Sequence, residues 1–264
     1  MKDHALSAWR FRHFILAAVQ GEIRGRFARS KIGALWIVLN PLAQAAIFAL
    51  VLSQVLAARL PGESSPAAYP MYLMAGLAAW GLFSEILSRS LNIFIEYSGA
   101  MKKIAFPRIC LPLIVLGVAL VNHAFLLASI AVVFLFFGET PHLAWLYLPL
   151  GIGLVAAFAF GLGIFLGVLN VFVRDIAQIM GVVLQMWFWL TPVVYVRDIL
   201  PAPLQTIVGY NPMTALAAIY QNAMVFHRAP DWAALASVCG IALVFVAAAM
   251  LVFRRASPEL VDAL

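Results

Sequence analysis

Charged residues are scarce in this sequence, and their scarcity excludes an ordinary soluble domain. Only 11% of the 264 residues are Asp, Glu, Lys or Arg, against about 25% in typical soluble domains. Five long apolar runs contain no charged residue, and a sixth contains only Glu85. Each run can cross a hydrocarbon core about 30 Å thick, which takes about 20 helical residues. The sequence predicts an all-α membrane protein with six transmembrane helices, at about 34–57, 69–88, 109–136, 143–170, 177–196 and 233–253.

The sequence also lacks the patterns of a redox, metal or nucleotide site. Cys110 and Cys239 form neither a C-x-x-C pair nor a metal-ligand spacing, so we interpret both as packing residues. No G-x-x-x-x-G-K-[ST] phosphate loop occurs. Ion-coupled transporters place ionisable residues at mid-membrane, and these spans have almost none. We expect no metal and no cofactor on this chain, so a partner must supply any energy for transport.

The cations that are present fall almost entirely on one set of loops. Of the 17 Lys and Arg residues, only Arg59, Arg197 and Arg228 lie in the other set. The positive-inside rule therefore predicts that both termini are cytoplasmic. The same rule explains the net charge of +6, so we expect no nucleic-acid partner. No apolar stretch directly follows Arg10 and Arg12, which argues against a cleavable signal peptide.

The chain divides into one membrane domain with short flanking segments. Residues 1–33 read as an amphipathic helix in the cytoplasmic headgroup region, with a solvated basic tail as the alternative. Residues 34–254 form a single transmembrane domain, and 255–264 form a short cytoplasmic tail. Residues 90–105 predict a short helix parallel to the membrane on the cytoplasmic side. The proline-rich segment 197–232 is too broken to span, so it predicts external re-entrant or interfacial helices.

The few titratable residues of the spans have structural interpretations. Glu85 and Arg89 are one helical turn apart at the cytoplasmic end of the second span, where a local ion pair or snorkelling explains them. His123 is a lone histidine on an apolar helix. We interpret it as a packing residue, with a proton relay as the alternative.

Uncharged polar residues align on single helical faces. They are Trp36, Asn40 and Gln44 in the first span, and Gln178, Gln185, Trp189 and Pro192 in the fifth. Such faces suit a wet conduit or helix–helix hydrogen bonds, and the spacing alone does not decide between them. In the fourth span, Gly163-x-x-x-Gly167 favours close helix packing.

Aromatic residues are dense where the external ends of the spans are expected. They are Tyr69, Tyr72, Trp80, Phe83, Trp187, Phe188, Trp189, Tyr195, Tyr210 and Tyr220. An interfacial aromatic belt explains them. A sugar-stacking surface is the alternative, because aromatic faces pack against pyranose rings while Tyr and Trp polar groups form hydrogen bonds.

Several local motifs, in order along nearly the whole chain, resemble those of ABC-2 type exporter transmembrane subunits. Within these, they are most similar to the polysaccharide and O-antigen export permeases. The motifs are Glu22 to Trp36 with Asn40-Pro41, Ala75-Gly76-Leu77 with Trp80 and Phe83, Lys102-Lys103 to Phe106-Pro107 and Pro112, Asn170 to Arg174-Asp175-Ile176, Thr191 to Tyr195, and Asn211-Pro212. One departure is small: the family often has Arg-Asp-(Leu/Ile)-Lys where this chain has Gly21-Glu22-Ile23-Arg24. The acidic–basic pattern is kept.

The resemblance implies a homodimer that encloses a conduit, with two copies of a separate cytoplasmic ATPase that holds ATP and Mg. It places contacts with the ATPase at Asn92, Glu96, Lys102, Lys103, Phe106, Arg174 and Asp175. The resemblance makes the basic N-terminal segment, residues 1–33, an interface gate. It also makes four of its residues candidate contacts for a lipid diphosphate: Arg24, Arg26, Arg29 and Lys31. Positive-inside charge explains these four residues equally well. The conduit-lining candidates are Trp36, Asn40, Gln44, Tyr72, Trp80, Phe83, Gln185, Trp187, Trp189 and Tyr195.

The function that this resemblance implies is export of lipid-linked, O-antigen-type polysaccharide across the bacterial inner membrane. The alternatives are an ABC-2 exporter of another glycan, such as capsule or teichoic acid, or of a small lipid or drug. A membrane glycan-processing enzyme is a different class, but the external loops offer only Glu63, Glu139, Asp198 and Asp231, without a clustered motif. A channel without a partner is the remaining alternative, which co-purification of an ATPase would exclude.

Overall fold

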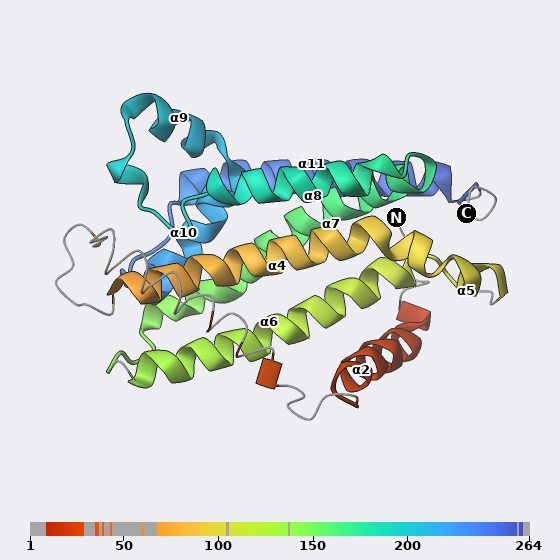
Figure 1. Cartoon of the computed structure of the whole chain (residues 1–264), viewed down its shortest axis with the longest axis horizontal. Coiled ribbons are helices and arrows are strands. Elements are labelled where there is room, and N and C mark those ends of the chain that lie inside the picture. Colours follow the sequence, from red (N-terminus) through yellow and green to blue (C-terminus); the bar gives the residue numbers. More distant parts are fainter. Residues whose placement is uncertain are drawn as a thin grey trace.

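The computed structural model shows a bundle of long helices (Figure 1). The structure describes residues 9–28, 35–36, 39, 43, 60, 68–103, 106–136, 138–257 and 259–260. The described residues contain no strand. The all-α prediction is therefore confirmed for this part of the chain.

Nine helices are described over these ranges (Figure 1). They are α2 (Arg12–Ala28), α4 (Ala68–Glu96), α5 (Ser98–Lys103), α6 (Cys110–Phe136), α7 (Leu148–Phe172), α8 (Asp175–Trp189), α9 (Ala202–Tyr210), α10 (Pro212–Met224) and α11 (Trp232–Ala256). Two 3-10 turns, η2 (Leu143–Tyr147) and η3 (Arg197–Ile199), lie between them. Figure 1 places α5 at one end of the bundle and α9 at the other, and we refer to these as the α5 end and the α9 end.

Four segments among the described residues are long and apolar enough to cross a membrane. They are Ala68–Glu96, Cys110–Leu135, Leu143–Phe172 and Trp232–Ala256. Large apolar side chains on these segments face outward, as at Val132, Leu243 and Val244, which are each more than half exposed. The chain is therefore a multi-pass membrane protein, while the predicted first span lies almost entirely outside the described residues.

The helix of the fifth predicted span is shorter than expected. The apolar run extends to residue 196, but α8 ends at Trp189. Pro192 has no backbone N–H to donate, and its ring conflicts with the carbonyl four residues earlier, so a helix cannot continue through it undisturbed. The hydrophobic pattern gave the extent of the apolar segment, but it did not predict that the helix would end inside that segment.

Helix α4 is longer than expected at the α5 end. A separate helix was predicted over 90–105, whereas α4 continues to Glu96 and only the six residues of α5 follow as a distinct helix. Packing explains the extension, because Phe94 is fully buried and its ring lies 5.9 Å from that of Phe253 on α11.

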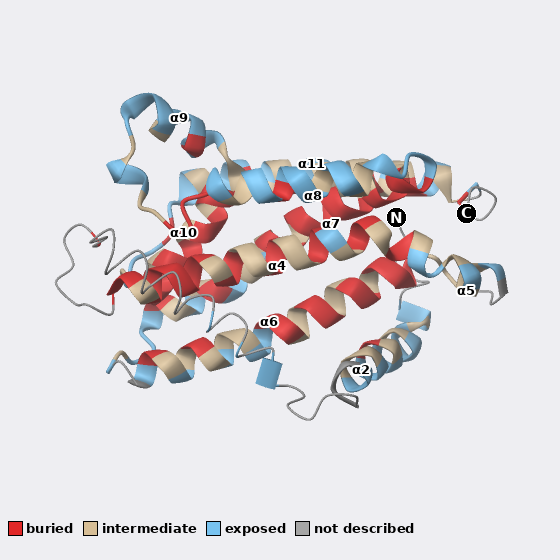
Figure 2. Ribbon diagram, viewed as in Figure 1, coloured by how far each residue is buried: buried red, intermediate tan, exposed pale blue. Residues whose placement is uncertain are grey.

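The centre of the bundle is a close contact between α4 and α7. A Cβ atom at Gly163 would come within 2.7 Å of Ser90 Cβ, and one at Gly167 would collide with the backbone oxygen of Ser90. Small residues let two helix backbones approach this closely. The close packing predicted from Gly163-x-x-x-Gly167 is confirmed, and Figure 2 shows buried positions on α7 where it passes behind α4.

Two shorter helices pack on this centre in different ways. α10 lies in the segment 197–232 and is largely buried, with Leu216, Ala217 and Tyr220 inaccessible to solvent. α2 lies beside α6 and is mostly exposed (Figure 2). Its buried residue, Val19, packs against Ile114 and Val118. Helices α2 and α10 are thus present where the N-terminal amphipathic helix and the external helices were predicted. Their positions relative to the membrane remain predictions.

Candidate functional site

A cavity of about 870 Å³ lies between α4, α6 and α8, and we call it the central cavity. Its lining combines aromatic, amide, hydroxyl and carboxyl groups with small and apolar ones. The lining residues are Trp36, Leu77, Trp80, Gly81, Leu82, Ser84, Glu85, Ser88, Asn122, His123, Leu126, Gly181, Leu184, Gln185, Phe188 and Trp189. Indole and amide groups beside hydroxyls offer both flat apolar faces and hydrogen-bonding groups, as a hydroxyl-rich ligand requires.

The fold brings together four of the predicted conduit residues at this cavity. Trp36, Trp80, Gln185 and Trp189 all line it, although they come from three separate parts of the chain. Trp189 is 57% exposed, so its indole is available for contact. Two other candidates, Asn40 and Gln44, lie outside the described residues.

Phe83 and Trp187 are placed in the core instead. Phe83 is fully buried and stacks on Phe158 at 5.5 Å between ring centroids, with the edge of Trp187 at 5.1 Å. Trp187 Nε1 donates a hydrogen bond to Asn211 Oδ1 at 2.8 Å. The sequence spacing placed both on aromatic-rich helices, but their neighbours direct them inward. They support the wall of the central cavity, because Trp80 packs on Phe83.

Tyr72 and Tyr195 hold the segment that follows α8. The hydroxyl of Tyr72, which is buried, lies 3.0 Å from the carbonyl oxygens of both Pro192 and Tyr195, and Tyr69 donates to Val194 O at 2.8 Å. Tyr195 in turn donates to Trp189 O at 2.9 Å. Non-helical backbone at membrane depth needs such partners, because lipid offers none. These tyrosines therefore position the break in α8.

Asn211 fixes the other side of the same break. Its side-chain amide donates to Leu190 O and to Thr191 Oγ1, and its oxygen accepts from the Met213 backbone, which caps α10. The sequence pointed to Asn211-Pro212 only as a motif, and the contacts now give the reason for the asparagine.

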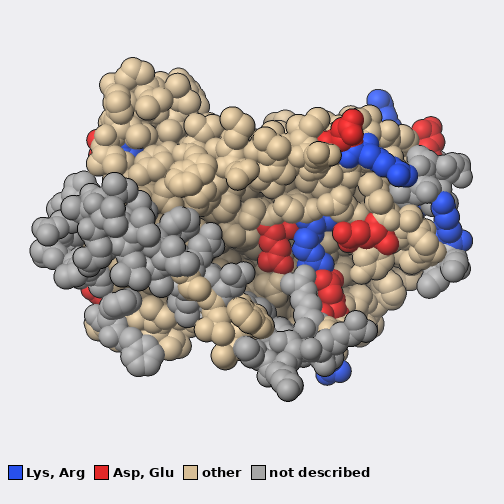
Figure 3. Space-filling view, in the orientation of Figure 1, with Lys and Arg blue, Asp and Glu red and all other residues tan. Residues whose placement is uncertain are grey.

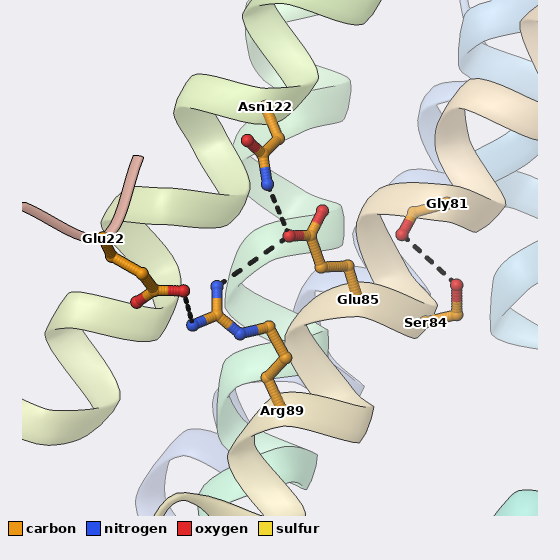
Figure 4. Close-up of polar contacts among 6 residues, drawn as sticks. All are labelled: Glu22, Gly81, Ser84, Glu85, Arg89 and Asn122. Carbon is orange, nitrogen blue, oxygen red and sulfur yellow. Dashed lines mark hydrogen bonds and ion pairs between the residues drawn. The ribbon is translucent and has the colours of Figure 1, made fainter. Parts of the chain in front are cut away.

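A charged network forms one edge of the central cavity (Figure 4). Arg89 on α4 donates to Glu22 Oε1 of α2 at 2.5 Å and lies 3.9 Å from Glu85 Oε1, one turn earlier on α4. Asn122 of α6 donates to Glu85 Oε1 at 2.7 Å. The predicted local pair of Glu85 and Arg89 is present, but the stronger contact joins two helices. Sequence spacing could not find it, because Glu22 and Arg89 are far apart along the chain.

Tyr97 lies near this network, just beyond the end of α4. Partial burial raises the pKa of its phenol above the usual value. The negative charge of Glu22 adds to the rise, and the positive charge of Arg89 opposes it. Tyr97 therefore stays neutral across the physiological range and leaves the charges of the network unchanged.

His123 is a packed residue in this structure. It is buried, and its Nε2 lies 3.0 Å from the hydroxyl of Tyr220 on α10. This hydrogen bond joins α6 to α10 beside the central cavity, which agrees with the interpretation of a satisfied packing histidine.

The residues predicted to contact an ATPase gather in the loops and helix ends that include α5. Asn92 and Glu96 are on the last turns of α4, Lys102 is exposed on α5, and Lys103 is on α5 with its side chain outside the described set. Arg174 and Asp175 begin α8. The ring of Phe106 lies 5.7 Å from that of Phe14 on α2.

Asn170 ties these loops together. Its amide nitrogen donates to Leu91 O of α4 at 2.9 Å, and its oxygen accepts from the Ala177 backbone of α8 at 3.0 Å. Asn170 is buried on α7, so three helices meet at one side chain. The sequence marked it only as the start of the Arg174-Asp175 motif.

Only some of the residues predicted to contact a lipid diphosphate lie in the described part of the chain. Arg24 is exposed on α2, and Arg26 is on the same helix with its side chain outside the described set. Arg29 and Lys31 lie outside the described residues. Among the residues that the structure describes, no group of three or more His, Cys, Asp or Glu side chains could hold a metal ion.

Comparison with known proteins agrees with this architecture. The O-antigen export system permease protein RfbA of Klebsiella pneumoniae is 32% identical over 207 residues, which cover 76% of each protein. The RfbA protein of Myxococcus xanthus is 26% identical over 265 residues and covers 97% of each. The polysialic acid transport protein KpsM of Escherichia coli is 35% identical over 71 residues, 27% of this chain and 26% of KpsM. Residues 13–225 match the ABC-2 type transporter family, so the chain belongs to that family of membrane transporters, as its motifs predicted.

Proposed function

We propose that this chain is the permease subunit of an ABC exporter that moves lipid-linked, O-antigen-type polysaccharide from the cytoplasm to the periplasm. The observation that carries the proposal is the lining of the central cavity. The relatives that match most of the chain are O-antigen export permeases, which supports the same cargo. Trp36, Trp80 and Trp189 offer flat faces to sugar rings, and Gln185 and Asn122 offer amides to hydroxyls.

The energy comes from a separate ATPase subunit in this proposal. The sequence has no phosphate-binding loop of its own. Two ATPase copies, with ATP and Mg bound to them, would engage the α5 end, where Lys102, Arg174 and Asp175 lie. Asn170 supports this role, because it connects the start of α8 to the end of α4 and both helices line the central cavity.

The assembly is a homodimer with six spans per chain in this proposal. Membership of the ABC-2 transporter family supports a second copy, which would close the central cavity into a conduit. By the positive-inside rule, the α5 end would face the cytoplasm from a bacterial inner membrane, because Arg108, Arg254 and Arg255 lie near it. Both termini would then be cytoplasmic.

Other cargoes are the second candidate. The match to KpsM favours a capsular polymer, but it covers about a quarter of the chain, whereas the RfbA matches cover three quarters or more. An exporter of a small lipid or drug would need a largely apolar cavity, and this one contains carboxyl, amide and hydroxyl groups.

Deletion in the native host tests the proposal. Surface long-chain glycan should disappear and lipid-linked polymer should accumulate inside, and the wild-type chain should restore export. Gln185→Leu should restore it several-fold less well, because it removes an amide from the lining, whereas Gln178→Leu on the same helix lies outside the lining and should rescue fully. Normal surface glycan in the deletion strain, with no second exporter present, would reject the polysaccharide cargo.

A further inference from the structure

We propose that Arg89 is a positioning residue that clamps α2 to the edge of the central cavity, and that its contact with Glu22 is released when the transporter opens. The clamp is a property of the structure alone, whereas its release during transport rests on the proposed export function. The clamp comprises Arg89, Glu22, Glu85 and Asn122 (Figure 4). Figure 3 shows acidic and basic side chains side by side near the middle of this face, apart from a second charged group toward its upper right.

The first step is the charge balance of the clamp. One guanidinium stands between two carboxylates that belong to different helices, Glu22 on α2 and Glu85 on α4. The three side chains are each about a quarter exposed, at 23%, 23% and 28%, so their charges are only partly screened by water. Without Arg89, the two carboxylates would repel one another across the contact. The sign of the charge at residue 89 therefore decides whether α2 is attracted or repelled.

The second step is that the two arms of the clamp differ. The Glu85 arm lies within α4 and is held to α6 by Asn122, so it belongs to the packed bundle. The Glu22 arm reaches a helix that is mostly exposed. When Glu22 moves away, Arg89 still faces Glu85, so no partly buried charge is left without a counter-charge. Removing the only partner of such a charge is strongly destabilising, and this arrangement avoids that cost. The Glu22 contact can therefore open and close reversibly.

The third step is the limited apolar contact that accompanies the clamp. Val19 lies one turn from Glu22 on α2, and a Cβ atom on Gly117 of α6 would come within 2.9 Å of its side chain. This notch sets where α2 docks, and around it Ile15, Ala18 and Ile23 of α2 are only partly buried, so the apolar contact is modest. The clamp and the notch act on the same face of α2, so weakening either one should loosen the helix.

The fourth step is the location of the clamp. Glu85 and Asn122 line the central cavity, while Arg89 points toward Glu22 of α2. A shift of α2 therefore changes the charge beside a cavity residue directly. Phe14 of α2 also contacts Phe106, next to the predicted ATPase-contacting loop, so α2 touches both the ATPase side and the cavity side of the permease.

The test measures α2 docking and transport separately, in the full transporter reconstituted in lipid nanodiscs with its ATPase. Cys110 and Cys239 are replaced by Ala, and Val19→Cys reports docking through its rate of reaction with N-ethylmaleimide, since Val19 is only 9% exposed. Glu22→Gln and Arg89→Gln should each speed labelling about fourfold, equivalent to about 0.8 kcal/mol in the docking equilibrium. Glu139→Gln, at a glutamate just beyond the end of α6 that is far from α2, is the control and should leave the rate unchanged.

The charge-swapped variant Glu22→Arg with Arg89→Glu separates a clamp from a general packing effect. It restores an ion pair between α2 and α4, but it also sets Glu at residue 89 against Glu85 one turn away, so labelling should be slower than in either single variant without reaching the parent rate. Export in the single variants should fall several-fold while ATP hydrolysis continues, and the swap should recover part of it. Unchanged labelling in Glu22→Gln would overturn the clamp. Faster labelling with full export would overturn its release during transport.

The export function and the clamp can fail independently in this design. If the parent complex moves no lipid-linked glycan, the proposed cargo is wrong, but the labelling rates still decide the clamp. If glycan export proceeds and no clamp variant changes labelling, the clamp is wrong and the export function stands.

Discussion

Helices α10 and α2 both pack against the central bundle, but they are attached by different kinds of contact. α10 is largely buried, and neutral hydrogen bonds hold it, including those of Asn211 and of Tyr220 with His123. α2 is mostly exposed where its side chains are described, and Val19, its partly buried neighbours and the charged clamp attach it. Buried neutral hydrogen bonds are costly to break, whereas a partly exposed ion pair exchanges readily with water. The α9 end therefore has a fixed support, and the α5 end has a helix that can move.

The largest effect should come from breaking the bundle on which both helices pack. Gly167→Val would push a side chain into the backbone of Ser90, and α4 and α7 would have to separate. We expect a loss of at least about 3 kcal/mol, enough to prevent recovery of folded protein. Gly153→Val on the same helix is the matched control, because a Cβ atom there has open space. Size-exclusion chromatography of detergent-extracted protein measures both, and equal recovery would contradict the close contact.

The next largest effect should be at the fixed end. Asn211→Ala removes the acceptor for Trp187 and for the first turn of α10, and the donor for Leu190. Leaving such groups without partners should cost about 2 kcal/mol and lower the melting temperature measurably. Asn222→Ala, on the same α10, should change it much less. A melting temperature that is equally insensitive to both changes would show that α10 does not depend on its cap.

A smaller effect on stability, with a clear effect on transport, should follow from filling the notch under α2. Gly117→Val places methyl groups where Val19 now packs, so α2 must move outward. The bundle contacts of α6 with α4 remain, so we expect normal yield but export reduced several-fold. Gly240→Val on α11 is the control, because a Cβ atom there has open space. Gly181→Val on α8 also has open space, but Gly181 lines the central cavity and is therefore unsuitable.

The smallest effect on global stability should come from the clamp itself. Glu22→Gln and Arg89→Gln should each change the free energy of unfolding by less than about 1 kcal/mol, because the pair is partly exposed. Thermal unfolding followed by tryptophan fluorescence measures this change. A loss as large as that of Asn211→Ala would mean that the two ends are attached equally firmly, and the contrast between α10 and α2 would fail.

The hydrophobic pattern predicted the membrane helices well where it was longest. α6, α7 and α11 begin and end within a few residues of the predicted spans, because an apolar helix in lipid must satisfy its backbone internally over the full thickness. The predicted helix boundaries were wrong where side-chain packing or a proline decides where a helix ends. α4 runs past its apolar stretch because Phe94 packs on Phe253, and α8 stops inside its apolar stretch at Pro192.

The candidate site could be predicted only in part. Trp36, Gln185 and Trp189 were selected from helical spacing and Trp80 from the density of aromatic residues, and all four line the central cavity. The same aromatic density also selected Phe83, which is fully buried. Spacing shows which side chains share a face of one helix, but neighbouring helices decide whether that face meets a cavity or the core.

By itself, the sequence determined that this chain is a helical membrane protein, where most of its spans lie, and to which family of transporters it belongs. Those properties depend on local composition and on motifs read in order along the chain. Only the tertiary structure decided that Glu22 meets Arg89, that Asn170 joins three helices, and that Asn211 holds the break after α8. Each of these contacts joins residues from different segments of the chain, and their distances follow from how the helices pack.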